Sequence, residues 1–189
     1  MVAFAGRRQQ QRPRRPVIPA LHRGAHPSVP RALAAILLAL AALHAQAERI
    51  DGRVVTVADG DTIVVLDALK VQHRIRLGAI DAPEWSQPFG RRSRASLAQL
   101  IAGKTVQVQV DRLDRYGRSV GVVRLGEIDV NRMQIERGMA WWYRQYAGEQ
   151  RIPDRLAYER AERDAHRARR GLWSDAQPVP PWTWRTRHR

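Results

Sequence analysis

The sequence predicts an α+β domain that is mainly β, a small closed barrel of five strands accompanied by three helices. Short runs rich in β-branched residues, separated by turn signals, indicate the strands. Helical periodicity follows in three segments, and the 189 residues suffice for one domain with a buried core. The chain has no cysteine, which excludes disulfides and thiolate metal sites.

The strands are expected between residues 53 and 125. The first is rich in Val and Thr, and Asp59-Gly60-Asp61 then provides a turn before the second. In the third strand Val71, Ile75 and Leu77 fall on one face, which we expect to be buried. The five predicted strands are Arg53–Ala58, Thr62–Leu66, Val71–Ile80, Lys104–Val110 and Arg118–Leu125.

Each expected helix has a start or stop signal. Gly103 ends the first, Asp129 and Gly138 bound the second, and the third has a proline in its first turn. The three ranges are Ser93–Ala102, Val130–Arg137 and Pro153–Arg169. The inward stripe expected for the third helix consists of Leu156, Ala161, Ala165 and Ala168. The Pro/Trp/Arg tail of residues 176–189 has no periodicity and is predicted to be disordered.

The first 47 residues are expected to be a leader. Ala32–Leu43 is a run of 12 apolar residues, and Ala45-Gln46-Ala47 after it forms a small-residue cleavage site. Spanning a bilayer takes about 20 apolar residues, so we expect a signal peptide rather than a transmembrane helix. Cleavage after Ala47 would leave a secreted or periplasmic protein whose main domain is residues 48–175. The alternative is a buried core helix, although the run has no polar face.

The length of this leader raises a question about its start. Signal peptides are about 15–30 residues long, and translation from Val29 would leave the leader Val29–Ala47. The alternative is that the arginine-rich arm before Val29 is made and holds the precursor at anionic lipid.

The chain is strongly basic, with a formal net charge of +15. Such a charge favours polyanionic partners, either nucleic acid or an anionic membrane surface. A general preference for arginine over lysine would produce the same charge without any such partner.

Three motifs provide the residues needed to hydrolyse a phosphodiester: Asp59-Gly60-Asp61-Thr62, then residues 76–84 (RLGAIDAPE), then Asp114-Arg115-Tyr116-Gly117-Arg118. Aspartates at strand ends can bind a hard divalent cation, arginines can clamp phosphate, and a glutamate can activate water. Taken singly, these motifs would be a hairpin turn, a polar loop and solvated arginines. Their combination favours a site that hydrolyses phosphodiesters over these structural roles.

In order and spacing the three motifs resemble those of the staphylococcal-nuclease (thermonuclease) family: D-G-D-T, R-L-x-x-[IV]-D-x-P-E and D-x-Y-G-R. The resemblance covers about residues 49–175. It implies an OB-fold, a five-stranded barrel with three helices. It also implies a calcium-dependent enzyme that hydrolyses DNA and RNA and leaves 3′-phosphates, without a stable protein partner and as a monomer.

The same resemblance implies the metal ligands. Asp61 and Asp81 would bind Ca²⁺ directly, with the carbonyl of Ala82 as a third ligand and water completing the set. Ala82 stands where the family has threonine, a change that a backbone ligand survives. Asp59 would orient the turn around the site.

Catalytic roles fall, by resemblance, to Glu84, Arg76 and Arg118. Glu84 would act beside the attacking water, as general base or as orienting group, and the two arginines would bind phosphate. As surface groups, these side chains should be replaceable without loss of stability. All five of Asp61, Asp81, Glu84, Arg76 and Arg118 are present, which favours an enzyme over the alternative, a non-catalytic OB-fold nucleic-acid-binding protein.

Substrate-binding positions are implied for Tyr116, Tyr146 and Arg115. Another pocket position, tyrosine in the best-known member of the family, is matched by Arg144 here. Trp85 follows Glu84 directly and is a candidate for a substrate contact. At least one of Trp141 and Trp142 is expected in the core.

Overall fold

The computed structural model describes residues 48–188. The signal-peptide and start-site predictions, on residues 1–47, lie outside them. The strands are β1 (Arg49–Val57), β2 (Thr62–Asp67), β3 (Gln72–Leu77), β4 (Ile80–Asp81), β5 (Thr105–Leu113), β6 (Ser119–Leu125), β7 (Ile128–Asp129) and β8 (Trp141–Trp142). The helices are α2 (Gly90–Ile101), α3 (Val130–Glu136), α4 (Ile152–Arg167) and α5 (Pro181–Arg187), with 3₁₀ turns η1 (Arg144–Glu149) and η2 (Gly171–Ser174). Within this range no helix has the length and apolar character to span a bilayer.

Five strands close into a barrel, as the sequence predicts. The sheet order is β3-β2-β1-β5-β6-β7, with antiparallel neighbours, and β3 also pairs with β6 in parallel. That last pairing, which sets Ile75 opposite Ser119 and Leu77 opposite Gly121, closes the sheet on itself. Because the barrel strands are paired on both sides, the ends of β2 and β3 are held together, where the Asp61 turn and Arg76 lie.

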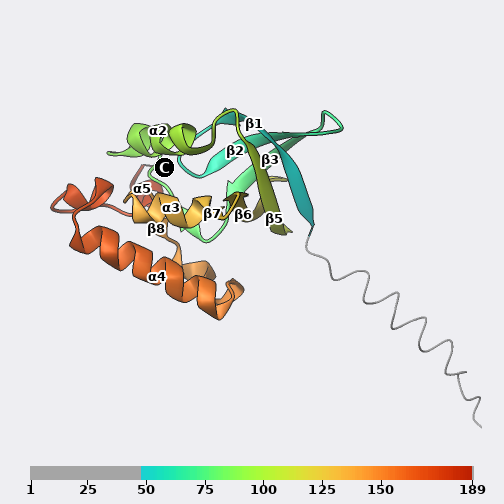
Figure 1. Cartoon of the computed structure of the whole chain (residues 1–189). Coiled ribbons are helices and arrows are strands. Elements are labelled where there is room, and N and C mark those ends of the chain that lie inside the picture. The colour runs from blue at the N-terminus through green and yellow to red at the C-terminus, as the bar shows by residue number, and fades with distance from the viewer. Residues whose placement is uncertain (1–47, 189) are drawn as a thin grey trace, which may run out of the picture. The chain divides into compact units, whose positions relative to one another are not determined.

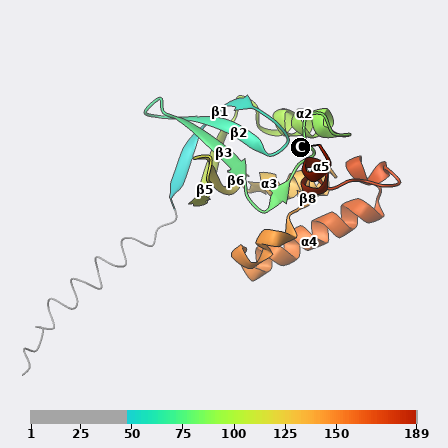
Figure 2. The ribbon, with the colours of Figure 1, turned by 180° about the vertical axis from the view of Figure 1, so that it is seen from behind.

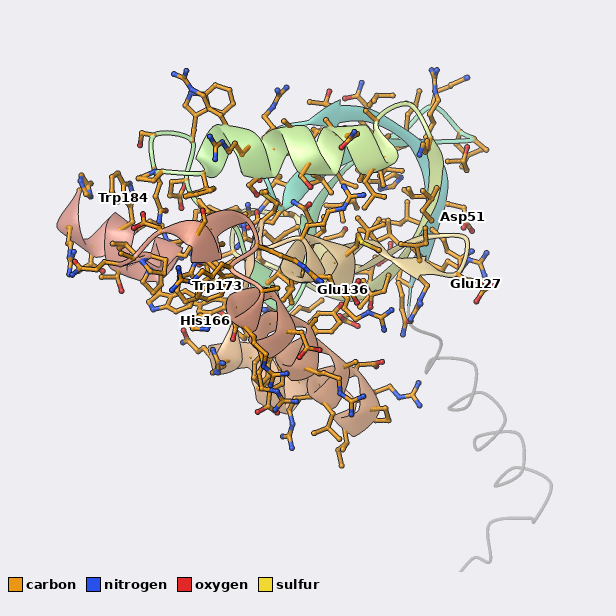
Figure 3. All side chains as sticks on the ribbon, turned by 60° about the vertical axis from the view of Figure 1, so that its left-hand side comes forward. Asp51, Glu127, Glu136, His166, Trp173 and Trp184 are labelled. Atoms are coloured by element: carbon orange, nitrogen blue, oxygen red, sulfur yellow. The ribbon has the colours of Figure 1, made fainter. Side chains whose placement is uncertain are left out.

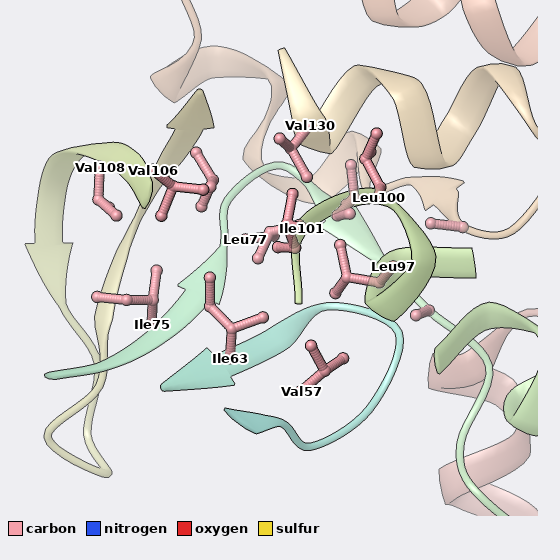
Figure 4. Packing of buried hydrophobic residues seen from close by; sticks show 14 of the residues in the cluster. Val57, Ile63, Ile75, Leu77, Leu97, Leu100, Ile101, Val106, Val108 and Val130 are labelled. Carbon is pink, nitrogen blue, oxygen red and sulfur yellow. The ribbon is translucent and has the colours of Figure 1, made fainter. Parts of the chain in front are cut away.

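The core fills the barrel and extends under α2. Leu97, Leu100 and Ile101 of α2 point toward the strands, and Ile63 and Ile75 belong to the same core from the sheet, with Ile75 on the side of Val106 and Val108 (Figure 4). The prediction for Val71 was wrong, because this side chain is 49% exposed. Val71 precedes β3, and its N–H donates to Asp67 Oδ1 at 2.9 Å in the turn after β2.

Helix α4 buries a different stripe from the one predicted. Leu156 is 53% exposed and Ala168 also lies on the surface, whereas Ala161 and Ala165 are buried as expected. The other buried positions are polar, Tyr158 and Glu162. The Tyr158 hydroxyl contacts Asp129 at 3.0 Å, which satisfies the hydroxyl inside the core. A stripe chosen by hydrophobicity alone therefore missed half of the packed face.

The C-terminal tail is ordered as a helix, which corrects the prediction of disorder. Residues 181–187 form α5, with a proline in the first turn, and α5 lies beside β8 in both views of the ribbon (Figures 1 and 2). Trp182 packs edge-on to Trp141 and stacks on Tyr143, with ring centroids 5.7 and 5.2 Å apart. Tertiary aromatic contacts hold a segment that has too few residues for a stable isolated helix.

The end of α4 is attached to the body through η2. Leu172 and Trp173 are buried, and Trp173 packs edge-on against Trp141. Trp173 also packs edge-on against His166 of α4 (Figure 3). The Leu172 N–H donates to the carbonyl of Gly138 at 2.8 Å. Residues 171–173 therefore fold the helix end back onto the domain.

Asn131 is fully buried and joins three parts of the fold. Its amide donates to the carbonyls of Gly78 and Gly121 at 3.0 Å, and its oxygen accepts from the Val123 N–H at 3.1 Å. Each buried polar group left unsatisfied costs roughly 1–3 kcal/mol. Replacing Asn131 with alanine is therefore expected to lower the free energy of unfolding by about 3 kcal/mol, measured by urea denaturation. An unchanged urea midpoint would contradict this role.

Candidate active site

The turn of residues 59–61 is fixed from both sides. Asp59 Oδ1 accepts the backbone N–H of Asp61 at 2.9 Å. Gln134 of α3 donates to the Gly60 carbonyl at 3.0 Å, and Ser93 of α2 lies so close that a Cβ on Gly60 would overlap its hydroxyl. The barrel and two helices therefore hold the Asp61 carboxylate in one place.

Asp81 is placed by a second, smaller sheet. It lies in β4, where it is opposite Trp141 of β8. The next residue of β8, Trp142, donates its N–H to the buried carboxylate of Glu162 at 3.0 Å. Helix α4 thus fixes β8, and β8 fixes Asp81.

Arg76 lies between these two aspartates. Its Nη1 donates to Asp61 Oδ1, and its Nη2 donates to Asp81 Oδ1 at 2.7 Å. The backbone N–H of Ala82 donates to Asp61 Oδ2 at 2.7 Å. Four residues that the sequence assigned to the site are therefore gathered around one point.

Burial and neighbouring charges have opposing effects on the pKa values of Asp61 and Arg76. Asp61 and Asp81 are 1% and 0% exposed. Burial raises the pKa of Asp61 to about 8, while the charge on Arg76 acts in the opposite direction. Although burial works against a charged guanidinium, the two carboxylates raise the pKa of Arg76 above its ordinary value. Ionised carboxylates here need cations next to them.

The expectation that the site residues are dispensable for stability fails for Arg76. Its side chain is only 19% exposed and compensates two buried carboxylates. Removing one member of a buried ion pair leaves the other charge uncompensated and destabilises a fold. Glu84 fits the expectation better, since its side chain is 40% exposed.

The donor set suits a hard divalent cation with few protein ligands. Asp61 and Asp81 both reach one guanidinium, so a single cation in this region could also contact both carboxylates. Across residues 48–188, no group of three or more His, Cys, Asp or Glu side chains is arranged to hold a metal ion. Water and backbone oxygen would have to supply the remaining ligands. Ala82 is adjacent to the cluster through its N–H.

A cavity of about 600 Å³ opens beside these groups. The residues lining it that the sequence assigned to catalysis or substrate binding are Arg76, Glu84, Arg115, Tyr116, Arg118 and Tyr146, and Asp59 also reaches it. Arg112, Tyr143 and Arg185 also line the cavity and were not predicted. With its arginines and tyrosines, the wall is suited to phosphate and to a stacked base or sugar.

Arg118 is held by its own turn. Asp114 Oδ2 accepts from Arg118 Nε at 2.7 Å, and Asp114 Oδ1 accepts the backbone N–H groups of Tyr116 and Arg118. Gly117 has a φ of 74°, which glycine adopts without strain. The guanidinium of Arg118 lies 5.6 Å from the Tyr116 ring centroid, and Tyr116 is 65% exposed. The turn directs both side chains to the cavity.

Arg144 does not take the pocket position that the resemblance implied. Its guanidinium pairs with Glu162 at 2.5 Å and covers the Trp142 ring. Tyr143 lines the cavity instead, with its ring edge-on to Tyr146 at 5.1 Å. The spacing of these two tyrosines could have indicated the pair, because residues three apart share a side of a helical turn.

For Trp141 and Trp142, the structure agrees with the prediction that at least one of them lies in the core. Trp142 belongs to the core at 6% exposure, while Trp141 packs against Trp173. Trp85 is 54% exposed beside the arginines of α2, and Arg91 and Arg94 lie over its ring. It stays a candidate substrate contact.

Comparison with known proteins agrees with this architecture. Residues 74–175 match the family described as "Staphylococcal nuclease homologue". The chain is 48% identical over 139 residues to an "Uncharacterized endonuclease" of Escherichia coli O157:H7, covering 73% of this chain and 86% of that protein. It is 41% identical over 164 residues to the "Micrococcal nuclease" of Shigella flexneri, covering 82% and 91% of the two chains. A "Probable staphylococcal-like nuclease CAN2" of rice is 38% identical over 119 residues, covering 63% of this chain and 31% of the rice protein.

The matched segment contains β4, Glu84 and the Arg118 turn, and the barrel around them has the predicted closure. Given a family match over more than half of the chain and extensive identity to nucleases, this protein belongs to the staphylococcal nuclease family.

Proposed function

We propose that this nuclease is an exported, calcium-dependent phosphodiester hydrolase that acts on DNA and RNA and leaves 3′-phosphates. The observation that carries the proposal is that Arg76, Glu84 and Arg118 line one basic, tyrosine-lined cavity, while the buried Asp61 and Asp81 both hydrogen-bond to Arg76. Export rests on the sequence of residues 1–47 alone.

The position of each residue in the site suggests its role. Arg118, on the cavity wall and anchored through Asp114, would hold the scissile phosphate and stabilise the charge that builds up during water attack. Glu84, the most exposed carboxylate of the group, would orient the attacking water or accept its proton. Arg76 would turn toward the phosphate while still compensating the buried aspartates.

Asp61 and Asp81 would hold the cation. When bound, Ca²⁺ would supply Lewis-acid polarisation of the phosphate and further charge stabilisation. Tyr116, Tyr143 and Tyr146 would contact the flanking sugar or base, which fits a nuclease with weak base preference.

Activity on denatured DNA is expected with Ca²⁺ and is expected to vanish with a chelator. The test uses the chain from Glu48 onward, with plasmid, denatured DNA and RNA as substrates. The ends of the products are then examined by phosphatase sensitivity, and a 3′-phosphate is expected. Full activity in chelator would refute the metal-dependent mechanism. Binding of DNA without cleavage under all metal conditions would favour the non-catalytic alternative.

A further inference from the structure

The C-terminal helix α5 reaches into the active site from outside the segment that matches the family. Its seven residues, 181–187, follow the matched range, which ends at residue 175. Yet Arg185 lines the same 600 Å³ cavity as Arg76 and Arg118. The tail therefore adds a residue that the family motifs do not contain.

Several contacts hold the tail in place independently of Arg185. Gln87, itself buried, donates from Nε2 to the Val179 carbonyl at 2.6 Å. Trp182 then stacks on Tyr143 with planes 13° apart, and Trp184 lines a small hollow together with Gln87 and Trp141. Gln87 also accepts the N–H of Glu84 at 3.1 Å. The tail and the Glu84 loop are thus one connected structure.

Arg185 forms a fork on two carboxylates. Nη2 donates to Asp81 Oδ2 at 2.8 Å, and Nη1 donates to Glu84 Oε1 at 2.7 Å and to Asp81 Oδ1 at 3.2 Å. Among the side-chain hydrogen bonds of the described residues, this is the one that Glu84 makes through its carboxylate. The direction of Glu84 therefore depends on Arg185.

The fork does not use every acceptor position of the two carboxylates. Two carboxylate oxygens offer about four lone-pair positions, and on Asp81 the guanidinium groups of Arg76 and Arg185 use three of them. One position has no hydrogen-bond partner among the described residues, on a carboxylate that is 0% exposed. On Glu84 the whole of Oε2 is unused, and this oxygen can meet the attacking water.

We propose that Arg185 is a positioning residue of the nuclease site, which holds Glu84 and Asp81 in their working directions and adds its guanidinium to those of Arg76 and Arg118 in the cavity. This inference rests on the proposed function. The opposite reading, that Arg185 blocks the cation, becomes an outcome of the test below.

The test compares Arg185→Ala with Arg187→Ala, a matched control two residues further along α5 whose side chain is exposed. The turnover number of the Arg185→Ala variant on denatured DNA at saturating Ca²⁺ is expected to fall about 10–100-fold, as for other residues that orient catalytic ligands. Its KM should change much less. Guanidinium ion at millimolar concentration should restore part of the turnover of Arg185→Ala. Arg187→Ala should behave like the unmodified chain.

Two further measurements make the result decisive. Because Arg76 still pairs with Asp81 in Arg185→Ala, the melting temperature of this variant should fall only slightly below that of Arg187→Ala. A large fall together with no guanidinium rescue would show a merely structural role. Calcium titration by calorimetry tests the blocking alternative, since tighter Ca²⁺ binding with undiminished turnover in Arg185→Ala would overturn the proposal. If the unmodified chain cuts no nucleic acid with Ca²⁺, the proposed function fails. If it cuts, and Arg185→Ala cuts equally well, this inference alone fails.

Discussion

Replacing Glu84 with glutamine is expected to lower the turnover number on denatured DNA by roughly 10²–10⁴-fold, the usual contribution of a general acid or base. Glutamine keeps the size of the side chain and can still accept a hydrogen bond from Arg185, so the pocket should keep its shape. It can neither take a proton nor carry charge toward the attacking water. Initial rates at saturating Ca²⁺ measure the effect.

The melting temperature distinguishes a loss of turnover in Glu84→Gln from misfolding of the variant. The Glu84 side chain is 40% exposed, so the melting temperature of Glu84→Gln should stay close to that of the unmodified chain. Glu159→Gln, an exposed change on α4, is the matched control and should leave both rate and stability unchanged. A Glu84→Gln variant that retained more than a tenth of the turnover would remove Glu84 from the chemical step.

Replacing Arg118 with alanine is expected to lower turnover about 10²–10³-fold, the scale seen when one preorganised donor to a developing negative charge is removed. Arg118→Lys should recover little of this loss, because an ammonium cannot reproduce the planar fork. The Asp114 carboxylate bonds the Nε of Arg118, and this fixes the direction of the fork. Single-turnover rates measure both variants.

The control for this arginine is Arg74→Ala, an exposed change on β3 that should leave the rate unchanged. Arg118→Ala removes a partly buried ion pair, but Asp114 still accepts the backbone N–H groups of Tyr116 and residue 118, so only a moderate fall in melting temperature is expected. If Arg118→Lys were as active as the unmodified chain, the role of Arg118 would be that of a point charge. If folded Arg118→Ala were fully active, the arginine would serve the turn alone.

Much of the site followed from local sequence because its chemistry is concentrated in three short motifs. Turn residues and strand alternation were enough to predict the barrel strands, and the resemblance of the three motifs to the family assigned Asp61, Asp81 and Arg76 to one site. These features depend on backbone preferences and on period-two burial, which act over a few residues. The Asp129 cap of α3 was predicted for the same reason, and its side chain accepts the N–H of Arg132 at 2.9 Å.

Features that depend on contacts between distant segments were decided only by the tertiary structure. Arg144 lies outside the cavity because Glu162 on α4 binds its guanidinium. Tyr143 lines the cavity instead. The polar stripe of α4 is buried because Asp129 and β8 supply its hydrogen-bond partners.

The clearest case is the tail. Its sequence has no periodicity and its helix is too short to be stable alone, so nothing local indicated order. Docking of Trp182 on Tyr143 and of Val179 on Gln87 fixes it, and these contacts place Arg185 against Asp81, 104 residues earlier in the chain. The sequence by itself determined the barrel and the motif residues, while packing between remote segments decided which further side chains complete the active site.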